Sequence, residues 1–230
     1  MRLLTSPDYA AGLRASIRTD RVTPSDLLPG YVDPAGSGRH TTHFSVLDAA
    51  GNRVAGTITL NGWFGTGIVV PGTGILLNNQ MDDFVMKPGV PNMYGLVGAE
   101  ANAIAPGKRP LSSMSPTFVE GERGVAIMGT PGGSYIPSMV LLGILNWSAG
   151  ADAQAIVAAP RLHHQYRPDA VFAEPGAFSA DERAGLERRG HAFRDWPATT
   201  GNMHVVTWDV ATGKVDAASD PRWGGGAAVR

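Results

Sequence analysis

The sequence predicts a layered fold of the α+β class, and two observations support this. Hydrophobic residues make up 43% of the 230 residues and charged residues 17%, a composition typical of a globular chain rather than a disordered one. From residue 41 onward, segments with the alternation typical of β-strands come first, and segments with helical patterning are mixed with strands after them. This order indicates either a general α+β arrangement or an αββα stack, in which two sheets lie between two helical layers.

The first predicted element is a short helix, and a linker follows it. Ser6 and Pro7 are a typical cap and first-turn pair, with one apolar stripe after them. Residues 22–39 then hold three prolines and three glycines with little apolar content, which predicts a mobile linker. We therefore divide the chain into residues 1–40 and residues 41–230.

Two β-hairpins are predicted on either side of a long loop region. In the first, alternating apolar residues flank a turn at residues 48–52, and the second hairpin covers residues 117–128. Between them, residues 65–83 suggest a loop with one short strand. Residues 87–110 are rich in Gly, Pro and Asn, a composition typical of a long functional loop.

The last part of the sequence predicts helices mixed with strands. The expected helices are at residues 136–145, 151–159 and 179–189, and the expected strands are at residues 171–172, 204–208 and 214–217. The first of these helices is apolar throughout, which predicts a buried helix. The third begins with a capping box. Three consecutive glycines at residues 224–226 predict a flexible tail.

The bulk properties exclude several classes of function. The chain has no cysteine, so disulfides, zinc–thiolate sites and a cysteine nucleophile are excluded. The formal net charge is −1, which gives no reason to expect nucleic acid or an anionic membrane as a partner. The longest apolar run, residues 135–147, is too short to span a bilayer. Residues 1–8 hold no signal-peptide stretch, so we expect a cytoplasmic protein as the sequence stands, or a periplasmic or secreted one if a targeting segment lies on sequence not present here.

Thr41 begins the first predicted strand directly after the linker, and two interpretations are open. β-Branched residues favour strands, so a structural threonine is the ordinary one. A threonine that becomes the first residue of a cut chain is also a nucleophile, with its own α-amino group as the base. That amine has an intrinsic pKa of roughly 7.7–8.0, close to the working pH where a general base performs best.

Seven short motifs follow one another at characteristic spacing from residue 41 onward. They are TTHFSV (41–46), TLN (59–61), GTG (65–67), LNNQMDDF (77–84), PGVPN (88–92), KRPLSSMSP (108–116) and PGGS (131–134). In this order they resemble the γ-glutamyltransferase family, namely its small subunit and the end of its large subunit. The resemblance implies the C-terminal half of an αββα N-terminal-nucleophile hydrolase, with residues 1–40 as a remnant of the large subunit's C-terminus.

The resemblance also implies a reaction, which is γ-glutamyl transfer from glutathione and related γ-glutamyl amides, or their hydrolysis. Thr41 is implied as the nucleophile after autocleavage of the His40–Thr41 bond, and Thr59 as the residue whose hydroxyl orients it. The γ-glutamyl ester on Thr41 then passes to water or to the amine of an amino acid or peptide. Thr59 and Asn61 alternate on the second predicted strand, so both are expected to point to one face, towards Thr41.

The same resemblance implies how the γ-glutamyl donor is held. Asn61 and Asp83 match the positions that bind its α-amino group, for which a carboxylate is a natural partner. Ser112 and Ser113 match the positions whose hydroxyls hold its α-carboxylate. Without the resemblance, the two serines are equally an ordinary Ser-Ser turn.

Three further positions complete the implied site. Gly132 and Gly133 match the pair whose backbone N–H groups form an oxyanion hole, where the missing side chains let the tetrahedral intermediate approach the backbone. A Pro-Gly-Gly turn is otherwise a common loop feature. Tyr94 resembles the residue that closes over the bound substrate in many members.

We expect no metal and no other cofactor. His163 and His164 are adjacent, so on a strand they would face opposite sides, and histidines of this kind are more often hydrogen-bonded parts of the structure. No segment has the strand–GxxxxGK–helix form of a phosphate-binding loop.

The chain departs from the family in length. Family members are much longer, and their large subunit supplies an arginine for the donor carboxylate and completes the sheets. We therefore expect a fragment, a truncated sequence or a split-gene product that needs a large-subunit partner half. Two alternatives stay open: a cephalosporin (glutaryl) acylase, which would use Thr41 on a dicarboxylic side chain without an α-amino group, and a catalytically inactive fragment that only binds or assembles.

Overall fold

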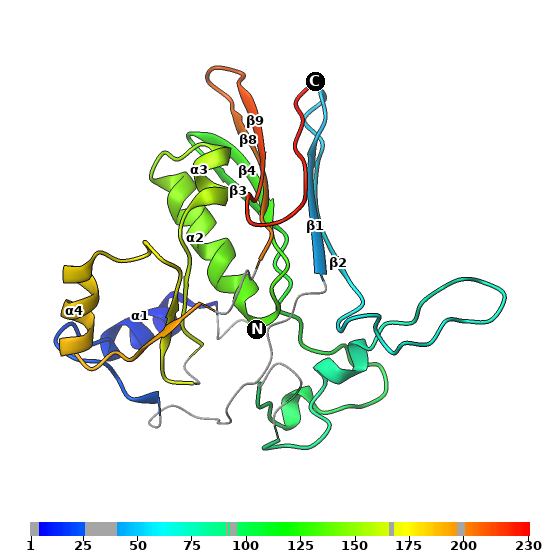
Figure 1. Cartoon of the computed structure of the whole chain (residues 1–230), viewed down its shortest axis with the longest axis horizontal. Coiled ribbons are helices and arrows are strands. Elements are labelled where there is room, and N and C mark those ends of the chain that lie inside the picture. Colours follow the sequence, from blue (N-terminus) through cyan, green and yellow to red (C-terminus); the bar gives the residue numbers. More distant parts are fainter. Residues whose placement is uncertain (1–4, 26–40, 91, 93–95, 166–167, 197–200) are drawn as a thin grey trace.

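The computed structural model describes residues 5–25, 41–90, 92, 96–165, 168–196 and 201–230. Its helices and strands, in chain order (Figure 1), are α1 (Pro7–Ser16), β1 (Thr41–Leu47), β2 (Arg53–Thr59), β3 (Thr117–Gly121), β4 (Gly124–Gly129), α2 (Ile136–Ser148), α3 (Ala153–Ala158), β5 (Leu162–His163), β6 (Val171–Ala173), α4 (Ala180–Arg188), β7 (Phe193–Asp195), β8 (His204–Asp209) and β9 (Val215–Ser219). The short 3-10 helices η2 (Gln80–Asp83), η3 (Glu100–Asn102) and η4 (Gly133–Tyr135) lie in loops between them. Both predicted hairpins and all the predicted helices are confirmed, whereas β5 and β7 have no counterpart in the sequence predictions.

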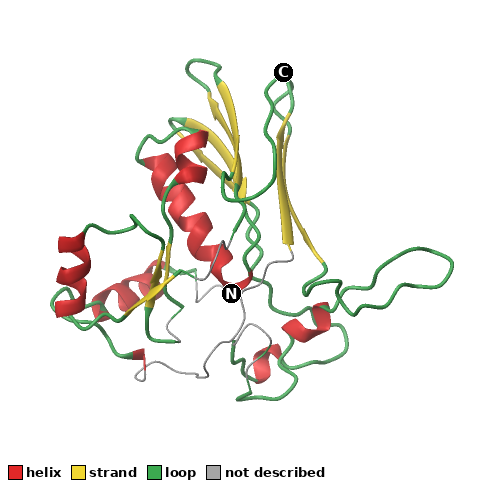
Figure 2. Cartoon of the chain, in the orientation of Figure 1, coloured by secondary structure: helices red, strands yellow, loops and turns green. Residues whose placement is uncertain are grey.

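The central part of the chain is a stack of one helical layer and two β layers. The larger sheet has the strand order β3-β4-β8-β9 and is antiparallel throughout. Helices α2 and α3 pack on one face of it, and the β1–β2 hairpin lies over the other (Figures 1 and 2). This arrangement agrees with the predicted αββα fold. Within the residues that the structure describes, no second helical layer covers the outside of the hairpin.

The β1–β2 hairpin turns its polar side inward. Its turn is closed by Asp48, whose Oδ1 accepts hydrogen bonds from the backbone N–H groups of Ala50 and Asn52 at 2.9 and 2.8 Å. His43 points between the sheets and is only 3% exposed. The opposite side, here called the outer hairpin face, carries the exposed apolar side chains Phe44, Val46, Val54 and Ile58. The alternation in the sequence therefore identifies the strands, but the apolar positions are not the buried ones.

The hydrophobic core lies between the larger sheet and the α2–α3 layer. Its central members are fully or almost fully buried: Ala126, Met128, Ile136, Met139, Ile156, Val157 and Val205. Burying one such aliphatic side chain contributes roughly 1.5–3 kcal/mol. The prediction of a buried helix is wrong for the outer side of α2, because Leu141 and Leu145 are 54% and 55% exposed. Among the described helices, none has the length and apolar character needed to cross a membrane.

A smaller sheet, β5-β6-β7, lies beside the stack together with α1 and α4. The predicted capping box at the start of α4 is confirmed, since Ser179 and Glu182 exchange the two expected hydrogen bonds. The N-terminal segment is held here as well. The Ser25 backbone N–H donates to Oδ2 of Asp169 at 2.8 Å, and the Val22 N–H donates to the Arg189 carbonyl at 2.9 Å.

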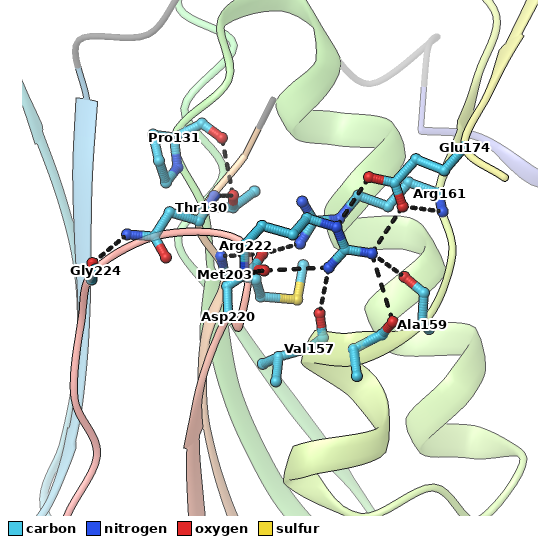
Figure 3. Close-up of polar contacts among 12 residues, drawn as sticks. Thr130, Pro131, Val157, Ala159, Arg161, Glu174, Met203, Asp220, Arg222 and Gly224 are labelled. Carbon is cyan, nitrogen blue, oxygen red and sulfur yellow. Dashed lines mark hydrogen bonds and ion pairs between the residues drawn. The ribbon is translucent and has the colours of Figure 1, made fainter. Parts of the chain in front are cut away.

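The C-terminal segment is anchored by a buried ionic cluster (Figure 3). Asp220 is 1% exposed and pairs with Arg161 and Arg222, and Arg222 also pairs with Glu174 at 2.7 Å. Burial acts to raise the pKa of Asp220, but the charge of Arg161 and the hydrogen bonds from Arg161, Arg222 and Met203 together outweigh burial, and the pKa is lowered. The chain beyond this cluster is not free: Gly224 accepts a hydrogen bond from Asn202 at 3.1 Å. The glycines predicted as a flexible tail therefore begin against the body of the protein.

Candidate active site

Thr41 and Thr59 face each other at the open end of the β1–β2 hairpin. Thr41 is the first residue of β1 and pairs in register with Thr59, the last residue of β2. The hydroxyl of Thr41 donates to Oγ1 of Thr59 at 3.0 Å. The two side chains share a face of the hairpin because they are direct cross-strand partners. The structure thus brings the predicted nucleophile and the predicted orienting residue into contact.

Asn61 reaches the same place by a turn rather than by strand alternation. Strand β2 ends at Thr59, and Asn61 adopts a positive φ of 74°, so the prediction that both lie on one strand is wrong. Asn61 is 4% exposed; its backbone N–H donates to Thr59 Oγ1 at 2.9 Å, and its Nδ2 donates to the Asn79 carbonyl at 3.1 Å. Asparagine tolerates this backbone conformation better than most residues, and the turn brings its amide to the cavity.

Asp83 ends the 3-10 helix η2 and presents its carboxylate to the cavity. Burial raises its pKa, while hydrogen bonds from Gln80 and Asn61 oppose that shift. The bond from Gln80 Nε2 to Asp83 Oδ2 is 3.0 Å long. The neighbouring Asp82 accepts a hydrogen bond from Asn79 at 2.7 Å and does not line the cavity that holds Thr41. The two adjacent carboxylates therefore have different surroundings.

Ser112 and Ser113 also line the cavity. The backbone N–H of Met114 donates to Oγ of Ser112 at 3.2 Å, and the hydroxyl of Ser115 donates to the Ser113 carbonyl at 3.0 Å. These local bonds are those of a Ser-Ser turn. The turn nevertheless places both serines in the lining of the cavity that holds Thr41.

Gly132 and Gly133 form the turn between β4 and α2. Their φ values are 144° and 57°, both in the region that favours glycine. Gly133 lines the cavity, and Gly132 is buried directly before it. The turn leads through η4 into α2, so its backbone N–H groups lie near the positive end of a helix dipole.

One cavity thus gathers most of the predicted site. It is lined by the predicted residues Thr41, Thr59, Asn61, Asp83, Ser112, Ser113 and Gly133. Tyr94 and His40 lie outside the described residues. The sequence predictions missed the polar lining residues Gln80 and Asn92. Both stand inside motifs that carried the resemblance, which is the signal that could have identified them.

The histidines His43, His163 and His164 have protein partners. His43 contacts Thr57 Oγ1 at 2.8 Å and Ser45 Oγ at 3.1 Å. Nδ1 of His163 lies 2.7 Å from Oγ of Ser138, and Nε2 of His164 lies 3.2 Å from Oδ1 of Asp169. Across the described ranges, no group of three or more His, Asp or Glu side chains is arranged to hold a metal ion.

Comparison with known proteins places the whole chain in one family. The family model described as Gamma-glutamyltranspeptidase matches residues 1–230. The glutathione hydrolase proenzyme of Escherichia coli K12 is 46% identical over 225 residues, which are 95% of this chain and 38% of that protein. The Helicobacter pylori γ-glutamyltranspeptidase T380A mutant has a TM-score of 0.74 and 41% identity over 79% of this chain and 100% of the solved chain.

A cephalosporin acylase is also structurally similar, with lower identity. The enzyme from Bacillus halodurans has a TM-score of 0.74 but 28% sequence identity, over 97% of this chain and 40% of that one. The chain spans between 33% and 39% of the length of the bacterial glutathione hydrolase proenzymes from two Pseudomonas sources and E. coli.

Proposed function

Because the chain belongs to the γ-glutamyltranspeptidase family, we propose that it is the catalytic part of a γ-glutamyltransferase or glutathione hydrolase, with Thr41 as the nucleophile. The observation that carries this proposal is the convergence, in one cavity, of the Thr41–Thr59 hydroxyl pair with two kinds of polar groups. The first kind is Asn61 and Asp83, and the second kind is Ser112 and Ser113. This arrangement suits a substrate that carries both an ammonium and a carboxylate next to a reacting carbonyl.

The acyl transfer begins at the hydroxyl of Thr41. After cleavage of the His40–Thr41 bond, Oγ1 of Thr41 attacks the γ-carbonyl carbon of the donor and its proton passes to the new α-amino group. The amine product leaves with that proton as the C–N bond breaks, and a γ-glutamyl ester of Thr41 remains. Water or an acceptor amine then attacks the ester, and the Thr41 hydroxyl regains a proton. Thr59, which already hydrogen-bonds Thr41, keeps Oγ1 aimed at the carbonyl.

The head group of the donor is the proposed ligand of the polar walls. The Asp83 carboxylate pairs with the α-ammonium, and the Asn61 amide oxygen is a second acceptor. The hydroxyls of Ser112 and Ser113 donate to the α-carboxylate. Burial already raises the pKa of Asp83, so an ammonium that pairs with it compensates a carboxylate that has lost part of its hydration.

The oxyanion of the tetrahedral intermediate is assigned to the Gly132–Gly133 turn. Donors that are fixed before the reaction stabilise the developing charge without reorganisation. Both glycines have φ values that an L side chain rarely adopts, and the missing side chains allow an intermediate to approach the backbone.

The large-subunit half of the enzyme is the proposed protein partner. The outer hairpin face exposes four apolar side chains, of which Ile58 is 60% exposed, and monomers rarely leave contiguous apolar patches of this kind uncovered. In the proposed assembly, residues 1–40 belong to the end of that half. The α1 residues Tyr9 and Leu13 are likewise 38% and 54% exposed.

Glutaryl acylase activity is the second candidate, because a cephalosporin acylase has the same fold at 28% identity. The two activities differ in whether the substrate carries an α-ammonium, which Asp83 would bind. The test is turnover of γ-glutamyl and glutaryl anilides by the chain assembled with a large-subunit half. We expect the γ-glutamyl substrate to be preferred. A preference for the glutaryl substrate would favour the acylase, and turnover of neither would favour an inactive binding fragment.

A further inference from the structure

The side chain of Thr130 is fully buried directly before the Gly132–Gly133 turn. Its Oγ1 accepts a hydrogen bond from the backbone N–H of Asn202 at 2.9 Å and donates one to the carbonyl oxygen of Pro131 at 2.8 Å (Figure 3). A backbone N–H can only donate and a carbonyl oxygen can only accept, so the hydroxyl has one possible orientation. The hydroxyl therefore uses its hydrogen for the bond to Pro131 and its oxygen for the bond from Asn202.

The bond to Pro131 controls the direction of the next N–H group. The Pro131 carbonyl and the Gly132 N–H belong to one planar trans peptide, in which they point in opposite directions. The proline ring fixes φ of Pro131, so its ψ angle is the main remaining freedom of this peptide. By holding the carbonyl oxygen, Thr130 sets the direction of the Gly132 N–H.

The other partner of Thr130 is itself held firmly. Asn202 precedes Met203, whose backbone N–H donates to Oδ2 of Asp220 at 3.1 Å. Asp220 is 1% exposed and lies in the ionic cluster with Arg161. The Asn202 N–H therefore belongs to a segment that is fixed in the protein interior. Through the hydroxyl of Thr130, the Pro131 carbonyl is hydrogen-bonded to this fixed segment.

We propose that Thr130 is a positioning residue, which presets the Gly132 N–H as a donor to the oxyanion of the acyl-transfer transition state. The proposal rests on the proposed function, in which Gly132 and Gly133 form the oxyanion hole. The oxyanion exists only after Thr41 has attacked, so the effect of Thr130 falls on kcat rather than on KM. The hydroxyl is the part that acts, because the methyl group of threonine makes no bond to the turn.

The test compares Thr130→Val, which keeps the shape and removes the hydroxyl, with Thr130→Ser, which keeps the hydroxyl. Both are assembled with the large-subunit half and assayed with a γ-glutamyl anilide. Removing a whole oxyanion donor lowers kcat by about 10²–10³, so we expect misdirecting one donor to lower kcat by about 10- to 100-fold in Thr130→Val. KM should change by less than about twofold, and Thr130→Ser should recover most of kcat.

Thr207→Val is the matched control. Thr207 lies on β8, and its hydroxyl makes no hydrogen bond within the part of the chain that the structure describes, so kcat should be unchanged. A folded Thr130→Val protein with wild-type kcat would overturn the proposal. Should Thr130→Val fail to give a native near-ultraviolet circular dichroism spectrum, Thr130→Ala takes its place with the same expectation.

Crystal structures of wild type and Thr130→Val give a readout that is independent of turnover. We expect the Pro131–Gly132 peptide to be rotated in the variant while β4 is unchanged. The same peptide orientation in both structures would overturn the positioning role, even if kcat falls. Absence of turnover by the assembled wild type would instead contradict the proposed function, and the peptide orientation would then decide the role of Thr130 alone.

Discussion

The imidazole ring of His43 lies directly against the backbone of Gly129, so closely that a Cβ atom at position 129 would fall 2.3 Å from Cε1 of the ring. His43 lies on β1, two residues after Thr41, and Gly129 ends β4 just before the turn that carries Gly132. The contact therefore joins the strand of the proposed nucleophile to the strand that leads into the proposed oxyanion hole.

Gly129→Ala should force the ring or the hairpin to move. Overpacking of this kind typically costs about 1–3 kcal/mol, and we expect a decrease of that size in the free energy of unfolding, measured with urea. In a His43→Ala background the ring is absent, so the same substitution should cost less than about 1 kcal/mol. Equal costs in both backgrounds would contradict a direct contact between the two residues.

The burial of His43 should make the stability of the protein depend on pH. Burial, with a smaller effect from the nearby His204, lowers the pKa of His43 to about 4, whereas the unfolded chain has a value near 6.5. At pH values between these two pKa values, His43 binds a proton in the unfolded state but not in the folded state. The stability due to neutral His43 is therefore fully present above the unfolded pKa and is lost as the pH falls towards the folded pKa. From pH 7 to pH 5 the loss due to His43 is about 2 kcal/mol.

His43→Gln should therefore flatten this pH dependence, because glutamine does not titrate. The measurement is urea unfolding of both proteins at several pH values between 7 and 5, with the difference between the two slopes as the result. Wild type and variant losing stability equally over this range would show that His43 is not held neutral. The pKa values of His163 and His204 are also lowered, so a residual dependence should remain in the variant.

The sequence alone was sufficient to predict the elements that are specified by residues close together in the chain. The capping box at Ser179 and the turn at Asp48 are hydrogen-bonded within a few residues, and both were predicted correctly. The short strands β5 and β7 depend on pairing with β6, which no local pattern encodes. The alternation in the β1–β2 hairpin does not by itself identify its buried side, because polar groups such as His43 fill the space between the two sheets.

The candidate site was predictable through its motifs rather than through its geometry. Asn61 was expected on a strand but lies in a turn with positive φ, and its contact with the site depends on Asn79 and on Thr59. Thr130 was not identified from the sequence. Its position becomes informative only when Asn202, 72 residues later in the chain, is seen to donate to it.

Self-cleavage at the His40–Thr41 bond is expected when the large-subunit half is supplied. The α-amino group that serves as the base exists only after that bond is broken, so processing must precede turnover. Intact-mass analysis should show a polypeptide that begins at Thr41. An assembled protein that remains uncut and is nevertheless active would contradict the N-terminal-nucleophile mechanism.

Substitution of Thr41 should separate the role of its hydroxyl from that of its methyl group. Thr41→Ala should abolish both cleavage and turnover of a γ-glutamyl anilide. Thr41→Ser should keep part of each, because the hydroxyl that bonds Thr59 remains while the methyl that restricts its rotamer is lost. Mass analysis and steady-state kinetics measure the two outcomes. Equal activity in wild type and Thr41→Ala would remove Thr41 from the mechanism.

Asp83 is the residue that should distinguish a transferase from an acylase. If the substrate carries an α-ammonium, Asp83→Ala leaves that cation without its charged partner in a half-buried pocket. Losing a hydrogen bond to a charged group costs about 1.5–3 kcal/mol, which corresponds to a decrease of about tenfold to hundredfold in kcat/KM for γ-glutamyl anilide. A glutaryl anilide has no ammonium, so its kcat/KM should hardly change.

The adjacent Asp82 provides the matched control for this prediction. Asp82 carries the same charge one residue away, but it is bound to Asn79 and does not line the cavity of Thr41. Asp82→Ala should therefore keep the preference for γ-glutamyl over glutaryl anilide, whereas Asp83→Ala should erase it. A general electrostatic effect of removing one carboxylate would make the two variants alike, and that result would contradict a direct contact between Asp83 and the ammonium. Loss of the preference in Asp83→Ala alone would assign the recognition of the amino group to this one side chain.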